Sequence, residues 1–346
     1  MPQAFQQPGP WDRRSVAVFV TKFLARRTRH EGEFVLTQNG GVPLRLGIAA
    51  LLAVLLVLAL ACGGDGEEGP RLVFYSGRDG DDDIYIMSAD GVEVRQLTDE
   101  PGRDYEPDSS PDGSTLVFAS QRAGEDGAQL FLMNVDGSGV RRLTFSAADG
   151  VRVTDDYAHW SPDGRRVVFQ RTTIPTEGRP DADIWMIDVE TGEETRLTDT
   201  PEDWDSTPSF AADGSSVLFE SNRDGDFDIY RLDIETMSVV QLTDEHGIDT
   251  EAKESPDGTR IAFSSVRDGD FELYVMGADG GNVRPLTDND TEDRCPQWSP
   301  DGKRLSFYSE RDGDREIYVM DADGSGAQRL TDSPGNDEVP DWVAGH

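Results

Sequence analysis

Cysteine is scarce in this sequence, so a framework of disulfide bonds cannot hold the protein together. The 346 residues include two cysteines, Cys62 and Cys295. Small secreted domains without a sufficient core need several disulfides. Apolar residues make up 36% of the chain, which is enough for a core at this length. We therefore expect packing alone to stabilise the fold.

Positive charge is also scarce. The chain has 32 lysine and arginine residues against 68 aspartate and glutamate residues, which gives a formal net charge of −36. The basic footprint of a nucleic-acid-binding protein is absent, so we expect no nucleic-acid partner. Such an acidic surface favours cations or basic peptides instead.

The sequence lacks the common catalytic motifs. It contains no G-x-S-x-G, H-E-x-x-H or G-x-x-x-x-G-K. His159, His246 and His346 have no evident nucleophile beside them, and Cys295 is more typical of a packed thiol. We therefore predict no enzymatic activity. Because carboxylates are plentiful, a lyase or hydrolase acting on polysaccharide is kept as the alternative.

One apolar run stands apart from the rest of the chain. Residues 46–61 are sixteen uncharged, mostly aliphatic residues, preceded by Arg45 and followed by Cys62. This pattern is typical of an export signal, and the run is short for a membrane span, which needs about 20 residues. Residues 59–62, Ala-Leu-Ala-Cys, resemble a bacterial lipobox, whose cysteine receives diacylglycerol and becomes the new N-terminus.

We therefore predict an N-terminal extension and signal peptide over residues 1–61, lipidation of Cys62, and a flexible tether over residues 62–70. An uncleaved N-terminal anchor is the alternative. Both place the remainder outside the cytoplasm, at the cell surface or in the periplasm. Because residues 42–45 would form a compact signal start, translation from Val42 instead of Met1 is a further hypothesis.

An internal repeat dominates the sequence after residue 70. Six repeats of about 45 residues match the length of one β-propeller blade. Each repeat predicts four strands, A to D: strand A ends in a Ser-Pro-Asp-Gly turn, strand B carries a phenylalanine, strand C is apolar on both faces, and strand D ends at Leu-Thr. The Leu-Thr pairs are Leu97-Thr98, Leu143-Thr144, Leu197-Thr198, Leu242-Thr243, Leu286-Thr287 and Leu330-Thr331.

The two ends of the repeat array complement each other. The first repeat begins at strand B with residues 71–74, and residues 338–343 form a lone strand A at the C-terminus. The last strand can therefore complete the first blade and remove exposed edges. The predicted fold class is all-β, a six-bladed β-propeller of four-stranded blades over residues 71–346, closed in this way and monomeric.

The repeat unit WSPDGKRLSFYSERDGDREIYVMDADGSGAQRLT at residues 298–331 resembles the repeat of TolB-like (WD-like) β-propeller proteins. The likeness covers nearly all of residues 71–343. It implies the fold, while function stays open because this fold hosts many activities. TolB proteins carry an α/β domain before the propeller, for which residues 63–70 leave no room. The resemblance therefore does not imply docking to the Tol–Pal partners.

An aspartate stands five residues before the strand-A aromatic position in every repeat. Circular closure would bring these residues together as a ring near the channel mouth, on the face that carries the acidic loops between strands B and C. In one interpretation each aspartate accepts backbone N–H bonds and shapes its own crossing. In the other, the ring binds a partner or a cation. The six residues are Asp104, Asp155, Asp205, Asp249, Asp293 and Asp337.

Calcium is the cation that such hard oxygen ligands suit. The spacing Asp79-x-Asp81-x-Asp83 is similar to that of a calcium loop, but Ile84 takes the place where an EF-hand needs glycine. Arg294 and Lys253 could instead neutralise part of the charge. We predict no cofactor, with calcium as the alternative.

Blade three breaks the uniformity of the repeats. The crossing at residues 145–156 and the loop at residues 172–183 are both long, and both belong to the acidic face. Long loops on a rigid scaffold commonly carry binding sites. Tyr157 and His159, at the start of this blade, are therefore predicted binding residues, with neutral drift of loop length as the alternative.

Together these features predict a lipid-anchored scaffold outside the cytoplasm. It would bind a protein, peptide or glycan partner of the cell envelope through its acidic face and channel, and would contact the membrane through the lipid anchor only.

Overall fold

The computed structural model describes residues 69–122, 127–145, 151–201 and 203–344, together with two short strands nearer the N-terminus. These strands, β1 (Glu33–Leu36) and β2 (Leu44–Gly47), pair with each other in antiparallel fashion. The chain divides into two compact units, residues 1–67 and 68–346. Cys62, residues 48–61 and the tether up to residue 68 lie outside the described residues, so their predicted roles stay predictions. Among the described residues, no helix has the length and apolar character needed to span a membrane.

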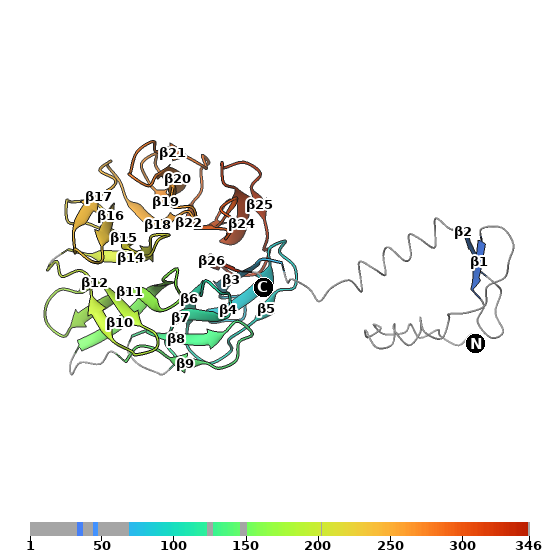
Figure 1. Ribbon diagram of the computed structural model, residues 1–346, viewed down its shortest axis with the longest axis horizontal. Helices are drawn as coiled ribbons and strands as arrows, with labels where there is room; N and C mark the ends of the chain where they lie inside the picture. The colour runs from blue at the N-terminus through green and yellow to red at the C-terminus, as the bar shows by residue number, and fades with distance from the viewer. Residues whose placement is uncertain are drawn as a thin grey trace. The chain divides into compact units, whose positions relative to one another are not determined.

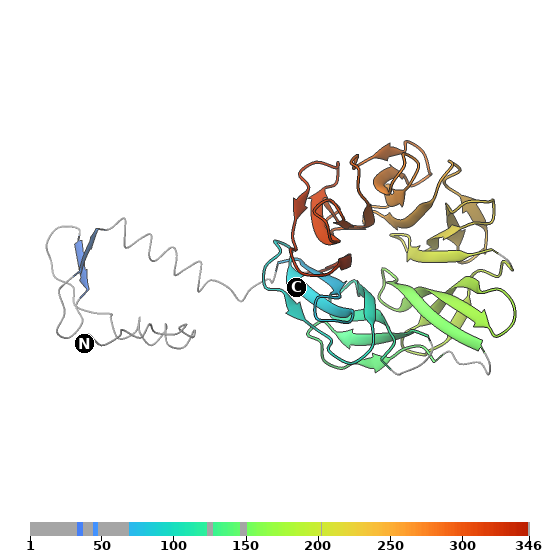
Figure 2. The same ribbon diagram turned by 180° about the vertical axis from the view of Figure 1, so that it is seen from behind.

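The second unit is a ring of six four-stranded antiparallel sheets, seen from its two sides in Figures 1 and 2. From the inside outward, blade one contains β26 (Asp337–Val343), β3 (Arg71–Ser76), β4 (Asp83–Ser88) and β5 (Arg95–Gln96). Blade two contains β6 (Asp104–Ser109), β7 (Thr115–Ser120), β8 (Gln129–Asn134) and β9 (Arg141–Arg142). Blade three contains β10 (Val151–Trp160), β11 (Arg166–Pro175), β12 (Asp181–Asp188) and β13 (Glu194–Arg196).

The remaining three blades follow the same order. Blade four contains β14 (Asp205–Phe210), β15 (Ser216–Ser221), β16 (Asp228–Asp233) and β17 (Val239–Gln241). Blade five contains β18 (Asp249–Glu254), β19 (Arg260–Ser265), β20 (Glu272–Gly277) and β21 (Arg284–Pro285). Blade six contains β22 (Asp293–Trp298), β23 (Arg304–Ser309), β24 (Glu316–Asp321) and β25 (Gln328–Arg329).

This arrangement confirms the predicted fold class and ring closure. Strand β26 pairs with β3 in antiparallel register, with Trp342 opposite Leu72 and Asp337 opposite Ser76. The indole N–H of Trp342 donates to the carbonyl of Gln297 in blade six at 3.1 Å. The closing strand thus completes the sheet of blade one, covers the edge of β3 and contacts blade six.

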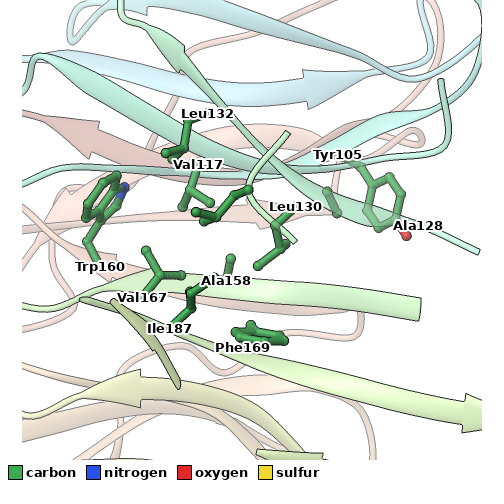
Figure 3. Packing of buried hydrophobic residues seen from close by; sticks show 12 residues of the cluster. Tyr105, Val117, Ala128, Leu130, Leu132, Ala158, Trp160, Val167, Phe169 and Ile187 are labelled. Carbon is green, nitrogen blue, oxygen red and sulfur yellow. The ribbon is translucent and has the colours of Figure 1, made fainter. Parts of the chain in front are cut away.

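The core lies between neighbouring blades because strands B and C are apolar on both faces. One phenylalanine from each strand B is at most 1% exposed: Phe74, Phe118, Phe169, Phe219, Phe263 and Phe307. Figure 3 shows the packing between blades two and three, where Val117 and Leu132 face Trp160 and Val167. Repetition of this packing around the ring stabilises a fold in which Cys295, the one cysteine among the described residues, forms no disulfide.

The recurring Leu-Thr pair fastens the short outermost strand to its neighbour. In blade four, the hydroxyl of Thr243 accepts the N–H of Ile229 at 3.0 Å and donates to Asp228 at 3.1 Å. Blade one repeats these contacts through Thr98. Since each outer strand has only two or three residues, these hydroxyl bonds supplement a short backbone ladder.

Candidate functional site

The innermost strand of every blade has a β-bulge at the same place. The register shifts one residue after the repeated aspartate of the blade, and the residue that follows has a positive φ between 45° and 59°. We call these six residues the bulge residues: Glu106, Tyr157, Thr207, Glu251, Cys295 and Val339.

Proline accompanies the bulge in four blades. Pro107, Pro208, Pro296 and Pro340 follow their bulge residues, and proline cannot donate to a strand ladder. Left-handed backbone at a residue other than glycine costs about 1–3 kcal/mol, and such strain gathers at functional sites. Its repetition in all six blades makes the centre of the ring the leading candidate for a functional site.

All six bulge residues line one cavity of about 50 Å³, which has room for several water molecules. Asp108, Lys253 and Gln297 line it as well, and every lining residue comes from an innermost strand. The cavity is therefore the central channel of the propeller. Its walls repeat in backbone but differ in side chain, unlike the uniform turns.

The sequence-predicted ring of aspartates occupies a different position. These six side chains are at most 2% exposed, and each is paired with an arginine of its own blade at 2.5–3.0 Å. The pairs are Asp104 with Arg122, Asp155 with Arg171, Asp205 with Arg223, Asp249 with Arg267, Asp293 with Arg311, and Asp337 with Arg78.

Aromatic rings hold these arginines in place. The guanidinium carbon of Arg223 lies 5.3 Å from the ring centre of Phe219 and 4.9 Å from that of Tyr230, and the hydroxyl of Tyr230 donates to Asp224 at 2.7 Å. Neither interpretation expected this pairing with an arginine of the same blade, and the role of the aspartates in shaping their own crossings stays a prediction. Contact of these aspartates with a partner stays a prediction. Among the described residues, no group of three or more histidine, cysteine or acidic side chains is placed to hold a metal ion.

Of the two residues predicted at the start of blade three, Tyr157 lines the channel and His159 lies beside Asp108, which lines it. Tyr157 is a bulge residue and is 38% exposed. His159 Nε2 lies 3.6 Å from Asp108 Oδ1, and the N–H of Phe210 donates to His159 Nδ1 at 3.5 Å. Burial, and then the nearby Lys253, hold the pKa of His159 well below its usual range. The imidazole is therefore neutral and serves as an acceptor.

The long segments of blade three extend its sheet. Strands β10 and β11 each have ten residues, against six in the corresponding strands of blades two and four. Val151 pairs with Pro175 at the far end of this hairpin. Residues 146–150 of the preceding crossing lie outside the described residues.

Sequence reasoning missed most of the charged channel residues. Burial, and then Asp341, raise the pKa of Asp108 well above its usual range, while burial raises the pKa of Asp341 to about 6. Burial lowers the pKa of Lys253, and the two carboxylates oppose that shift. A signal was present: Asp108 and Lys253 both line the channel, and both stand four places after the repeated aspartate of their blade.

Glu251 is another charged channel residue that sequence reasoning missed. Its Oε1 lies 2.7 Å from Nη2 of Arg294, and its Oε2 accepts the N–H of Cys295 at 2.9 Å. Burial alone would raise the pKa of Glu251, but Arg294 and these hydrogen bonds hold it below its usual value. Burial, and then Glu251, raise the pKa of the Cys295 thiol well above its usual range, which suits a packed thiol.

Comparison with known proteins gives consistent results. A family model described as the TolB beta propeller domain matches residues 66–203 and 181–295. An uncharacterized protein of Agrobacterium fabrum is 33% identical over 45% of this chain and 53% of its own length. A TolB homolog of Chlorobium luteolum is 32% identical over 49% of this chain and 35% of its own length. The chain thus spans about half the length, or less, of these curated relatives.

Solved structures show the same fold. TolB from Acinetobacter baumannii aligns with a TM-score of 0.67 and 20% identity, over 87% of this chain and 75% of that chain. An oligogalacturonate lyase in complex with manganese aligns with a TM-score of 0.55 and 19% identity, over 76% of this chain and 74% of that chain. At these identities the likeness concerns the fold alone.

Proposed function

This chain belongs to the TolB β-propeller domain family, and from that premise we propose that it is a binding protein outside the cytoplasm. Its channel and acidic face engage a protein, peptide or glycan partner of the cell envelope. The observation that carries this proposal is the channel wall, where six backbone-equivalent bulge residues present six side chains that do not form a repeat. A surface that differs from blade to blade on a uniform scaffold suits recognition of an asymmetric ligand.

Electrostatics favour a cationic ligand. The chain has a net charge of −36, and burial raises the pKa of Asp108 and Glu106, which line the channel. A bound cation would stabilise the ionised form of these carboxyls. Basic segments are therefore preferred over anionic polymers.

The test is capture of the partner by chemical crosslinking on intact cells. Thr207→Tyr narrows the channel with a side chain that the same backbone geometry already holds at Tyr157. We expect this variant to lose most of the captured partner. The control Val240→Tyr, on the outer strand β17 where Val240 is 59% exposed, should capture as much as the wild type. Equal capture by Thr207→Tyr and wild type would contradict binding through the channel.

We also propose that the propeller is attached to a membrane through a lipid on Cys62. The apolar run of residues 46–61 and the lipobox-like residues 59–62 support this. Mass spectrometry of the membrane fraction should find a diacylglyceryl cysteine as the N-terminus, and Cys62→Ser should abolish the modification. Recovery of an unmodified N-terminal segment attached to the propeller would favour the uncleaved anchor.

A propeller enzyme acting on polysaccharide is the second candidate. The channel favours it in one respect, since the raised pKa of Asp108 suits a general acid. The acidic channel would repel a uronate polymer, so a neutral glycan is the better substrate to try. We expect no shortened products after incubation with envelope glycans. Products that disappear in Asp108→Asn would replace the binding proposal with an enzymatic one.

A further inference from the structure

Two opposite junctions of the ring use a glutamate in the same way. Between blades two and three, Oε2 of Glu106 accepts the N–H of Tyr157 at 2.8 Å. Between blades five and six, Oε2 of Glu251 accepts the N–H of Cys295 at 2.9 Å. Both glutamates are bulge residues, and both bind the bulge residue of the next blade. The two junctions can therefore be compared residue by residue.

An arginine completes the junction between blades five and six. Nη2 of Arg294 lies 2.7 Å from Oε1 of Glu251, and the guanidinium carbon lies 4.0 Å from the ring centre of Phe271. The hydroxyl of Ser264 donates to Oε2 of Glu251 at 2.8 Å. The carboxylate is thus satisfied by a cation and two neutral donors, which is the arrangement that a buried charge needs.

The junction between blades two and three has an acid in the place of that arginine. Asp156 directly follows the repeated aspartate Asp155 in β10, as Arg294 directly follows Asp293 in β22. In the positions of Ser264 and Phe271 stand Ala119 and Ala128. Glu106 therefore keeps its backbone donor but gains a like charge as its neighbour.

The lack of a neighbouring cation is reflected in the pKa values of Glu106 and Asp156. Burial, and then Asp156, raise the pKa of Glu106 well above its usual range. Burial, and then Asp155, raise the pKa of Asp156 to about 7. Oδ1 of Asp156 is buried and has no hydrogen-bond partner among the described residues. Arg103 is near Glu106, but its guanidinium is 52% exposed and paired with Asp82 at 2.6 Å.

We propose that Glu106 and Asp156 form a recognition site for an arginine side chain of the bound partner, in the position that Arg294 takes at the opposite junction. The inference rests on the proposed function and names the chemistry of the ligand. A guanidinium group fits better than an ammonium group, because its planar fork can donate to both carboxylates at once. Tyr157, at the same junction, offers an exposed ring on which the guanidinium can stack.

The test uses the purified full-length protein and two blocked five-residue peptides. One peptide has a central arginine flanked by glycines, and the other has citrulline, which keeps the shape and removes the charge. In calorimetric titrations we expect the arginine peptide to bind at least about tenfold more tightly, the usual effect of a charge-assisted hydrogen bond. Equal binding of the two peptides would overturn the inference.

Substitutions locate the effect. Glu106→Gln and Asp156→Asn should each remove most of the preference for arginine, while the control Asp323→Asn, in an exposed turn, should retain it. Asp156→Arg would supply the guanidinium from the chain itself, so it should raise the melting temperature and abolish the preference. If Asp156→Arg does not fold, the test rests on Glu106→Gln and Asp156→Asn. A preference that persists in both of them would refute the site.

Failure of the arginine site can be distinguished from failure of binding through the channel. Cellular capture that is sensitive to Thr207→Tyr but unchanged in Glu106→Gln and Asp156→Asn would leave the channel as the binding site and remove arginine as its ligand. Loss of capture in all three variants supports both proposals.

Discussion

At the scale of one residue, Asp205 is an example of the ion pair that joins the innermost strand of each blade to the loop between strands B and C. Its carboxylate is fully buried and pairs with Arg223 through both oxygens, at 3.0 and 3.1 Å, while Thr200 donates to it at 2.8 Å. The aspartate could be found from the sequence because it repeats. Its partner could not, because sequence does not show whether an arginine in an acidic loop turns to solvent or inward.

Removing this carboxylate should lower the free energy of unfolding considerably. Asp205→Ala leaves Arg223 without its buried partner, and breaking one side of a buried pair costs about 3–5 kcal/mol. Denaturant unfolding should show a loss of that size. The control Asp314→Ala, in the loop between strands B and C of blade six, should change the unfolding free energy by about 0.5 kcal/mol or less. Similar effects for the two variants would show that the ion pair contributes little.

The channel residues illustrate the limit of sequence reasoning at this scale. Tyr157 and His159 were predicted because they differ from the other repeats; Tyr157 lines the channel, and His159 lies beside Asp108, which lines it. Glu106 differs as well, but the sequence contains many such acids. Lys253 is one of three lysines in the chain, and the sequence suggested it only as a charge that neutralises the aspartates. Only the structure of the bulged strands shows which of these residues face the channel.

At the scale of the element, the short outer strands depend on the Leu-Thr hydroxyls. Thr243→Val removes the acceptor of the Ile229 N–H and the donor to Asp228 while keeping the shape. We expect a loss of about 1–3 kcal/mol, because a buried N–H is left unpaired. The control is Thr195→Val on the exposed face of β13, which should be close to neutral. An equally small effect at Thr243 would refute the hydroxyl contact as the reason for the repeated pair.

The closing strand makes a second prediction at this scale. Trp342 in β26 and Trp298 in β22 are 5% and 7% exposed, and each indole N–H donates to a carbonyl of the preceding blade. Trp342→Ala and Trp298→Ala should therefore cost similar amounts, about 3–5 kcal/mol each. Equilibrium unfolding of both variants makes the comparison. A much smaller loss for Trp342→Ala would mean that the ring is closed more weakly than its other junctions are joined.

At the scale of the whole molecule, the fold could be predicted almost completely from the sequence. Six repeats fix the number of blades, and the unmatched strands at the two ends fix the closure. The bulge could not be predicted, because residues before proline are usually extended, whereas Glu106 and Cys295 take left-handed φ values. The same φ recurs at six different residue positions around the ring, so the place in the blade and not the residue type determines this conformation.

The whole ring should gain stability as the pH falls from about 8 to about 5. Burial raises the pKa of Asp83 and Asp228 to about 6 and that of Glu272 to about 7. The unfolded chain takes up these protons only near pH 4. The folded state therefore binds more protons in this window, and this contribution to stability is lost as the pH rises through 6 to 7.

Melting temperatures at constant ionic strength check this dependence. We expect a rise on acidification from pH 8 to pH 5, and a weaker rise in Asp228→Asn, which already resembles the protonated form. Turn aspartates such as Asp257, whose pKa is lowered to about 2 chiefly by the Ser255 hydroxyl, stay ionised across this window. A melting temperature that falls on acidification would show that other groups dominate the balance.

The central claim is that the partner binds through the channel, and site-specific photocrosslinking in intact cells tests it most directly. A benzoyl-phenylalanine side chain replaces Tyr157 in the channel or, separately, Val240 on the outer strand β17. We predict a discrete crosslinked partner from position 157 and none from position 240. Crosslinking from position 240 with none from position 157 would contradict the account.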